Sequence, residues 1–506
     1  MQRASAQGKA FFNSRYLLGR RIMAEREISL GFEQKLIVLT IALSAFLGSL
    51  DVTIVNISLP AISHHFNSSL SVISWVIMLY LLILGSLMMA FGRLGDIVGY
   101  RKIFLSGLAI FTLGSILCGL APKIEMLILF RGFQAAGEAM CASVGPAMIS
   151  SMLPDEVRGR AFGYVATFSS VGVIAGPVIG GALTAHLGWR WIFFVNVPVG
   201  ISALLIGLAV IPEVRGSRRH LSFDLAGSIL LFAAIFALLY SFNMGRELGW
   251  GSLFILGSVA VSFLCCAVFA RWERRSPEPL VDFRLFRSLP LLYAFFASLL
   301  FSLAFSGAFF LLPFYLELVK NIRSDIAGVI LITSSIAVMI VAPIAGKISD
   351  RAGGRIMCLL GALFSVLAFI LFSGLSRSSS SGFLLLALSI LGIGMGIFLP
   401  VNRSVVMSLS PANMKGLTSS MAGTFAALGQ VIGVAAFETM LSETIISGEL
   451  TGIGAFHELV AVEALTKAFH NAFSLGILIS IGVVILSILA EERSKEPQPT
   501  VIASAL

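Results

Sequence analysis

Charged residues are scarce in this chain: Asp, Glu, Lys and Arg make up 12% of its 506 residues, whereas hydrophobic residues make up 57%. A soluble globular domain carries about a quarter charged residues, so this composition excludes a water-soluble globule. It also excludes a disordered chain and a collagen. Only five cysteines are present, all in apolar stretches and none in a CxxC pair. A disulfide scaffold and a thiolate metal site are therefore not expected.

Signatures of enzymes and of ATP-driven pumps are missing too. The chain has no GxxxxGK[ST] phosphate loop, no HExxH or GxSxG motif and no paired carboxylates in a loop. Its six histidines are dispersed. The net charge of +9 is spread over short loops, which argues against a nucleic-acid partner. The sequence predicts no enzymatic activity, no cofactor and no metal site.

What the chain has in abundance is long apolar runs. A membrane-spanning helix needs about 20 apolar residues. Hydropathy predicts fourteen such spans, near residues 36–60, 72–92, 102–121, 126–150, 161–183, 190–212, 223–243, 252–271, 290–318, 326–347, 355–375, 383–404, 416–441 and 468–490. The expected fold class is an all-α polytopic protein of the plasma membrane.

Basic residues orient these spans. With the N-terminus inside, 26 Lys and Arg residues fall on the inner side and seven on the outer side. Positive charge favours the cytoplasmic side, so both termini are predicted to lie inside. Residues 1–35 lack the features of a cleavable signal peptide. They are expected to be a cytoplasmic segment, either a basic stretch lying on the membrane surface or, in the favoured interpretation, a segment preceding a true start at Met23.

An internal repeat organises the chain. The pattern GxxxDxxGxR occurs twice, with an offset of 254 residues between the copies. The first copy comprises Gly92, Asp96, Gly99 and Arg101, and the second comprises Gly346, Asp350, Arg351, Gly353 and Arg355. Both follow an outside-to-inside span, which indicates two parallel six-helix halves. The predicted divisions are 36–212 and 289–490 for the halves, 213–288 for an inserted helix pair with its linker, and 491–506 for a cytoplasmic tail.

The repeated loops are predicted to form a cytoplasmic gate. Glycines permit a tight turn, and an Asp at a helix terminus can pair with Arg or cap a neighbouring helix. Such a contact would hold one state of a rocking transporter and break in the other. The loops resemble the signature of the major facilitator superfamily, although Ile97 replaces the Arg that this family usually has there.

The fifth predicted span contains a glycine-rich motif formed by Gly172, Gly176, Pro177, Gly180 and Gly181. Glycines four residues apart permit close helix packing. The motif resembles the antiporter motif of the superfamily's drug exporters, and this resemblance implies a pliable seam against the other bundle. The stretches around Asp51 and from Trp189 to Gly200 are similar to the fourteen-span drug:proton antiporter group. The resemblance covers about residues 33–490.

Two charges inside predicted spans are candidates for proton coupling, because charges are costly in lipid. From helix rise, Asp51 is expected about 24 Å and Arg131 about 21 Å above the inner face. We therefore expect the two side chains to meet, so that protonation of Asp51 releases Arg131. The alternative is a static buried pair. The superfamily links the matching Arg of its fourth span to proton transfer.

Glu138 follows Arg131 by seven residues on nearly the same helical face. It is predicted to be either a second proton carrier, an anchor for a cationic substrate or a neutral buried carboxyl. Asn56, Gln134 and Gln430 are predicted substrate-cavity residues. Glu317 and Glu438, near the outer ends of their spans, are expected to reach solvent.

Together these features predict a secondary active transporter that exports small amphipathic or cationic compounds in exchange for protons. Its expected partners are a small-molecule substrate, protons and the lipid bilayer, and it is expected to work as a monomer. One alternative is a transporter of the same fold for a metabolite, an amino acid or a lipid precursor. The other, from a different class, is a membrane receptor or scaffold that transports nothing.

Overall fold

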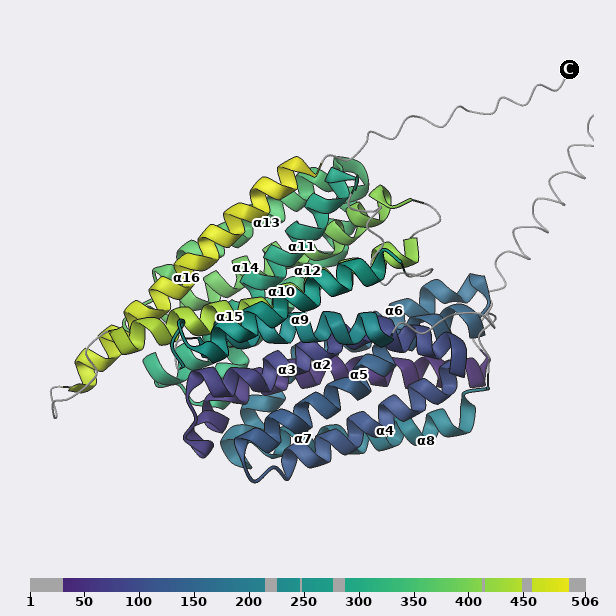
Figure 1. Cartoon of the computed structure of the whole chain (residues 1–506), viewed down its shortest axis with the longest axis horizontal. Helices are drawn as coiled ribbons and strands as arrows, with labels where there is room; N and C mark the ends of the chain where they lie inside the picture. Colours follow the sequence, from purple (N-terminus) through teal and green to yellow (C-terminus); the bar gives the residue numbers. More distant parts are fainter. Residues whose placement is uncertain are drawn as a thin grey trace, which may run out of the picture.

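Long apolar segments cross lipid as helices, because hydrocarbon offers the backbone no hydrogen-bond partner. The computed structural model describes residues 31–213, 225–245, 248–275, 287–411, 415–447 and 457–490, and these form an all-helical molecule (Figure 1). Its helices are α2 (Phe32–Phe66), α3 (Leu70–Val98), α4 (Tyr100–Gly119), α5 (Ile124–Met152), α6 (Asp155–His186), α7 (Trp191–Phe194), α8 (Asn196–Val210), α9 (Leu225–Met244), α10 (Leu253–Glu273), α11 (Leu289–Phe314), the π-helix η2 (Tyr315–Val319), α12 (Ser324–Ala352), α13 (Gly354–Ser373), α14 (Ser381–Leu409), α15 (Lys415–Ser447) and α16 (His457–Leu489).

Each predicted span falls on one of these helices, or on two successive ones at 190–212 and 290–318. Twelve candidate spans among the described residues are long and apolar enough to cross a membrane. Helices α5 and α9 are not among the twelve. The interior of α5 carries Arg131 and Glu138, and the apolar stretch of α9 covers only Ile229–Ser241. The all-helical fold class is therefore confirmed, while the total of fourteen spans stays a prediction.

The second glycine of each GxxxDxxGxR copy makes the same turn in both halves. Gly99 separates α3 from α4 with φ 109°, and Gly353 separates α12 from α13 with φ 88°. A positive φ is accessible to glycine without the steric penalty that a side chain incurs. The glycine spacing in the sequence thus reflects two equivalent turns.

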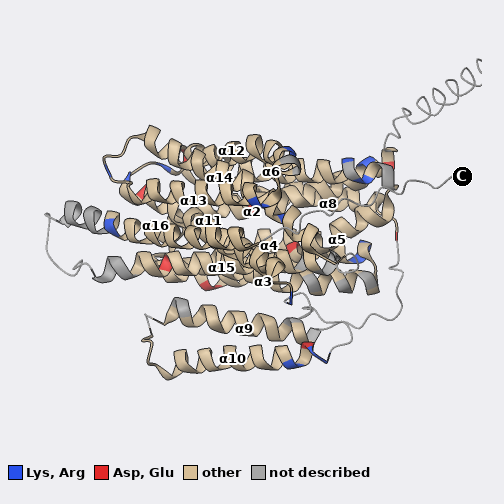
Figure 2. Cartoon of the chain, turned by 90° about the horizontal axis from the view of Figure 1, so that it is seen from above, with Lys and Arg blue, Asp and Glu red and all other residues tan. Residues whose placement is uncertain are grey.

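Helices of the N-terminal half pack mainly on one another, as do those of the C-terminal half. Helix α2 packs on α6, α4 on α5, and α8 on both α2 and α4; in the other half, α11 packs on α15 and α16, and α13 on α14 and α16. The pairs α6–α12 and α3–α15 connect the halves. Figure 2 shows α9 and α10 as a pair beside the remaining helices, with α9 in contact with both α3 and α15.

The buried apolar side chains divide unequally between the two ends of the molecule. Where α2 ends and α3 begins, one continuous core includes residues of both halves, such as Ile54 and Leu312. At the opposite end, Ile37 and Phe104 belong to one core, and Met357 belongs to a separate one. We call these the joined end and the split end. The glycine turns lie at the split end, and Figure 1 shows the two groups of helices diverging there.

Candidate functional site: a buried charged cluster

Asp51 of α2 and Arg131 of α5 form an ion pair inside the N-terminal half. Arg131 Nη1 donates to Asp51 Oδ2 at 2.5 Å. The Asp51 side chain is 0% exposed and the Arg131 side chain is 1% exposed. The predicted contact between these residues is confirmed. Because an isolated buried charge is very costly, each of these groups depends on the other for compensation.

Amide side chains from two helices complete the coordination of the Asp51 carboxylate. Gln134 Nε2 and Asn196 Nδ2 donate to Asp51 Oδ1 at 2.8 and 3.0 Å. Gln134 also accepts from Arg131 Nη1 at 2.7 Å and donates to Ser115 Oγ of α4 at 2.8 Å. The ion pair is thus the centre of a hydrogen-bond network that joins α2, α4, α5 and α8.

Helix α3 supplies further contacts of Arg131. Arg131 Nε donates to the Val76 carbonyl at 3.2 Å, and the guanidinium carbon lies 4.0 Å from the centre of the Tyr80 ring. A cation over an aromatic face gains electrostatic stabilisation, more so where water is excluded. Five helices therefore fix the position of this one guanidinium.

Local sequence explains how these groups come together. A Cβ on Gly114 of α4 would lie 2.7 Å from the Gln134 Cα, so glycine there allows α4 to approach α5 closely. Asn196 begins α8 directly after the break between α7 and α8, and its side chain is completely buried. Sequence reasoning did not assign Asn196, Ser115 or Tyr80 to the site. For Asn196, the sequence offered one signal: a single Asn within an apolar run.

Glu138 lies beside this network but outside its hydrogen bonds. Its side chain is 9% exposed, and its carboxyl group packs against Gly48 of α2. A methyl group on Gly48 would overlap this carboxyl. The hydrogen bonds found among the described residues do not include one to the Glu138 carboxyl. A buried acidic group thus faces α2 one turn from Asp51.

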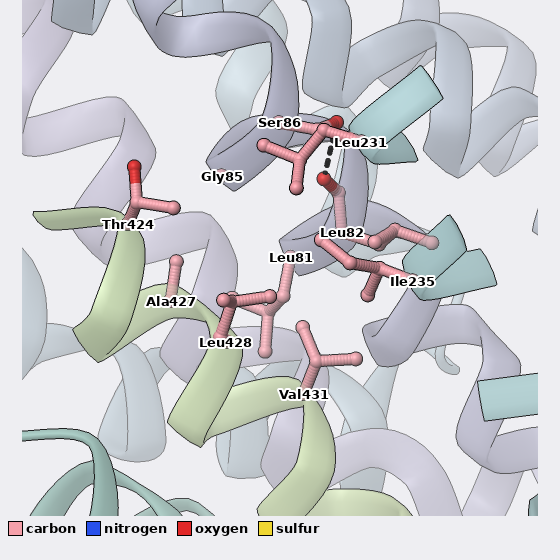
Figure 3. Close-up of a pocket in the computed structure, with 10 residues that line it drawn as sticks. All are labelled: Leu81, Leu82, Gly85, Ser86, Leu231, Ile235, Thr424, Ala427, Leu428 and Val431. Atoms are coloured by element: carbon pink, nitrogen blue, oxygen red, sulfur yellow. Dashed lines mark hydrogen bonds between the residues drawn. The ribbon is translucent and has the colours of Figure 1, made fainter. Parts of the chain in front are cut away.

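The three predicted cavity residues differ in their burial. Gln134 is completely buried in the charged cluster, whereas Asn56 and Gln430 are partly exposed. Figure 3 shows an apolar pocket between α3, α9 and α15, formed by Leu81, Leu82, Gly85, Ser86, Leu231, Ile235, Thr424, Ala427, Leu428 and Val431. None of the three predicted residues lines it. The pocket lies under α9, where this helix covers the contact between the two halves.

The predicted gate motif is only partly described. The side chains of Asp96, Asp350 and Arg351 lie outside the described part of the structure. Arg101 donates to the Leu208 carbonyl in the last turn of α8 at 2.9 Å. This contact stays within the N-terminal half. The predicted gate contact of the two Asp residues is therefore still a prediction, as is the start at Met23, since residues 1–30 also lie outside the described ranges.

The glycine-rich motif of α6 faces two different helices. Side chains at Gly172, Gly176 or Gly180 would collide with α2, which belongs to the same half. Gly181 instead packs against the backbone of Ser324 in α12, and Gly328 of α12 packs against the Pro177 carbonyl. The predicted seam against the other half thus holds for Pro177 and Gly181, while the other three glycines serve packing inside their own half.

Glu438 is the clearest departure from expectation. It was expected to reach solvent, but its side chain is 1% exposed. Ser71 Oγ of α3 donates to Glu438 Oε1 at 3.0 Å, and Ser442 Oγ donates to the same oxygen at 2.6 Å. Hydropathy placed Glu438 near a helix end, but α3 packs over that end and buries the carboxylate. The result is a polar contact between the halves at the joined end.

The described residues contain no group of three or more His, Cys, Asp or Glu side chains that could hold a metal ion. The charged cluster offers charges and hydrogen bonds. A buried ion pair with amide donors can hold or release charge, and two halves joined at one end can rock. These features together define a membrane transporter with a charged centre in one half.

Comparisons with known proteins agree with this class. The chain matches the Major Facilitator Superfamily over residues 41–434, and it belongs to this family. It is 32% identical to the multidrug resistance protein Stp of Mycobacterium tuberculosis, with 81% of this chain and 76% of Stp covered. It is 30% identical to the riboflavin transporter RibZ of Clostridioides difficile, with 82% and 90% covered.

Solved structures show the same fold. A bacterial homologue of the human lysosomal transporter Spinster, in an inward-facing and occupied conformation, matches with a TM-score of 0.64 at 15% identity. The match covers 91% of this chain and 97% of that one. The protein is thus a multi-pass transport protein of the bacterial plasma membrane, and not an enzyme.

Proposed function

We propose that this transporter exports small amphipathic or cationic compounds across the plasma membrane in exchange for protons. The observation that carries the proposal is the buried Asp51–Arg131 pair with its amide donors. Ionisable groups inside a membrane bundle are costly and are typical of substrate or ion pathways. The proton-coupling group comprises Asp51, Arg131 and Glu138, with the proton gradient as the energy source.

The network gives proton binding a way to act on helix packing. The ion pair and its amide donors connect four helices, and Arg131 adds contacts to a fifth. A change of one charge within this group alters the hydrogen bonds of every helix that meets there. Such a change can bias one packing of the two halves over another, which is what alternating access requires.

The two halves supply the moving parts. We assign them to residues 36–212 and 289–490, with residues 213–288 as an inserted pair and a total of fourteen spans. We assign both termini and the split end to the cytoplasmic side, an orientation that the bias of 26 basic residues against seven supports. In this state the halves are joined toward the outside and separate toward the cytoplasm, so an exported compound enters from inside. One chain contains both halves, so we expect it to work as a monomer.

The energy available suits an exporter. Moving one charge through 100 mV is worth about 2.3 kcal/mol, so a proton falling through about 150 mV supplies about 3.5 kcal/mol. At about 1.4 kcal/mol for each tenfold ratio, one proton supports a concentration gradient of a few hundredfold for an uncharged compound. A single titrating carboxyl is enough for useful efflux.

A second substrate class has support from one relative. RibZ is a riboflavin transporter and is about as similar to this chain as Stp is. A single aromatic metabolite in place of a range of cationic compounds is therefore the alternative. Competition separates the two: excess riboflavin blocks dye flux through a metabolite carrier far more strongly than unrelated amphipathic cations do, whereas an exporter of amphipathic cations is blocked by many of them.

The test is flux of a cationic dye in proteoliposomes under an imposed pH gradient. Wild-type protein is expected to accumulate the dye against its concentration gradient, and collapse of the pH gradient with an ionophore is expected to stop accumulation. Asp51→Asn is expected to abolish it. Glu33→Gln removes an exposed carboxylate from the same helix and is expected to change nothing. Wild-type flux that ignores the pH gradient would contradict proton exchange.

A further inference from the structure

The two buried carboxyl groups of the N-terminal half differ in how fully their charge is compensated. Asp51 receives the Arg131 guanidinium on one oxygen and two amide donors on the other. A proton arriving at Asp51 would have to displace one of these donors, which would leave a buried group unsatisfied. The observed geometry therefore makes Asp51 the counter-ion of Arg131.

Glu138 has the opposite setting. Glu138 is only 9% exposed. No hydrogen bond to its carboxyl occurs among the described residues. Gly48 leaves room for this carboxyl, because a Cβ there would lie 2.9 Å from Glu138 Oε2 and would overlap Oε1. A proton can bind to or leave Glu138 without breaking any contact of the cluster. Without hydrogen-bond compensation, the neutral form is favoured while the group is buried.

The groups that face Glu138 come from three helices. Asp51 of α2 and Tyr80 of α3 interact with it electrostatically, as does Cys141 on its own helix. Arg131 lies two turns away on α5 and is occupied by Asp51. The nearest formal charge of the same sign is therefore the Asp51 carboxylate.

These groups follow the contact between α2 and α5, which run in opposite directions. Asp51 faces Gln134, Gly48 faces Glu138, and Ser44 lies close to Cys141. From the first pair to the third, the position moves toward the start of α2 and the end of α5. Both of these helix ends lie at the split end. Glu138 therefore lies between the Asp51 network and a further polar contact closer to the end where the halves are separate.

We infer that Glu138 carries the transported proton, while Asp51 positions Arg131. The step is a simple dissociation: the carboxyl O–H bond of Glu138 breaks, the proton passes to water at the split end, and a carboxylate remains. In the opposite state of the cycle the carboxylate takes up a proton from the other side. This inference rests on the proposed proton exchange and assigns its proton to one residue.

The test separates proton drive from substrate translocation in proteoliposomes, with a quaternary ammonium dye as the probe. Glu138→Gln is expected to keep dye–dye exchange at equal pH within about twofold of wild type. It is expected to lose accumulation driven by a pH gradient at least tenfold. Glu138→Asp, which restores a titratable group, is expected to recover part of the accumulation. Glu125→Gln, an exposed position on the same helix, is the matched control.

A second readout measures the proton itself. Dye binding to purified protein in weakly buffered detergent is expected to release a proton from the wild type and from Glu125→Gln, but not from Glu138→Gln. Accumulation that persists in Glu138→Gln would overturn the inference. So would a Glu138→Gln variant that loses exchange as well and is not improved by Glu138→Asp. A wild type that exchanges dye but ignores the pH gradient would instead refute the proposed function.

Discussion

The Arg131 guanidinium and the Asp51 carboxylate meet at 2.5 Å in a place where water reaches neither group. Removing one partner of such a pair leaves an uncompensated buried charge, at a cost of about 3–5 kcal/mol. The Arg131 side chain is 1% exposed and the Asp51 side chain 0% exposed, so neither group reaches solvent in this state. Loss of this ion pair is therefore expected to lower the stability of the protein as well as its transport activity.

Asp51→Asn is expected to destabilise the protein by about 3–5 kcal/mol, because Arg131 then stays charged without a counter-ion. Replacing both residues, as Asp51→Asn with Arg131→Gln, is expected to recover most of this loss while transport stays absent. Thermal unfolding of the purified protein in detergent measures both effects. Equal stability of the single and double variants would show that the two charges do not compensate each other.

A glycine at position 48 is predicted to be required for stable packing of α2 against the Glu138 carboxyl. Gly48→Ala places a methyl group on the Glu138 carboxyl, and the α2–α5 contact must shift to accept it. Overpacking of this kind costs about 1–3 kcal/mol. The double variant Gly48→Ala, Glu138→Ala is expected to be more stable than Gly48→Ala alone, as a thermal unfolding cycle would show. Additive effects of the two substitutions would contradict the assigned contact.

The Ser71–Glu438 hydrogen bond is predicted to favour closure of the joined end. Hydrogen bonds to charged groups contribute about 1.5–3 kcal/mol, so Ser71→Ala is expected to shift the equilibrium between the two states more than tenfold toward opening there. Spin labels on the exposed residues Leu187 and Leu318 report the change as a longer distance. Ser150→Ala, whose hydroxyl bonds only within its own helix, is the control. An unchanged distance distribution in Ser71→Ala would remove this role.

The contact between α6 and α12 allows closure of the joined end to be tested by a steric clash. A side chain at Gly328 would collide with the Pro177 carbonyl, so Gly328→Val is expected to force the joined end apart. The same pair of labels is expected to show a larger separation than in Ser71→Ala, with dye exchange reduced at least tenfold. A Cβ on Gly257 of α10 would meet nothing within 4 Å, so Gly257→Val is expected to be neutral. A closed joined end in Gly328→Val would contradict the packing described.

Much of the fold was predictable because lipid restricts the backbone to helices. The prediction of a helix over 102–121 differs from Tyr100–Gly119 by two residues at each end, and the family assignment from the repeated loops is confirmed. The Asp51–Arg131 contact followed from helix rise alone. Depth arguments work here because both residues lie on long helices, Phe32–Phe66 and Ile124–Met152.

The rest of the site depends on contacts that no local pattern encodes. Asn196 reaches Asp51 across 145 residues of sequence, and its position depends on the break between α7 and α8. Glu438 is buried by a helix that lies 367 residues earlier in the chain. The place of Glu138 against Gly48 likewise requires the α2–α5 register. Hydropathy gives the depth of a residue but not the direction in which its side chain points.

The most direct measurement is proton movement driven by substrate alone, in proteoliposomes that enclose a pH indicator. A quaternary ammonium dye, which cannot carry protons itself, is added outside at equal pH. Proton exchange predicts that dye entry drives protons out, so the interior becomes more alkaline with wild-type protein and with Glu125→Gln. An interior that stays at its starting pH while dye enters, or that becomes more acidic, would contradict the account.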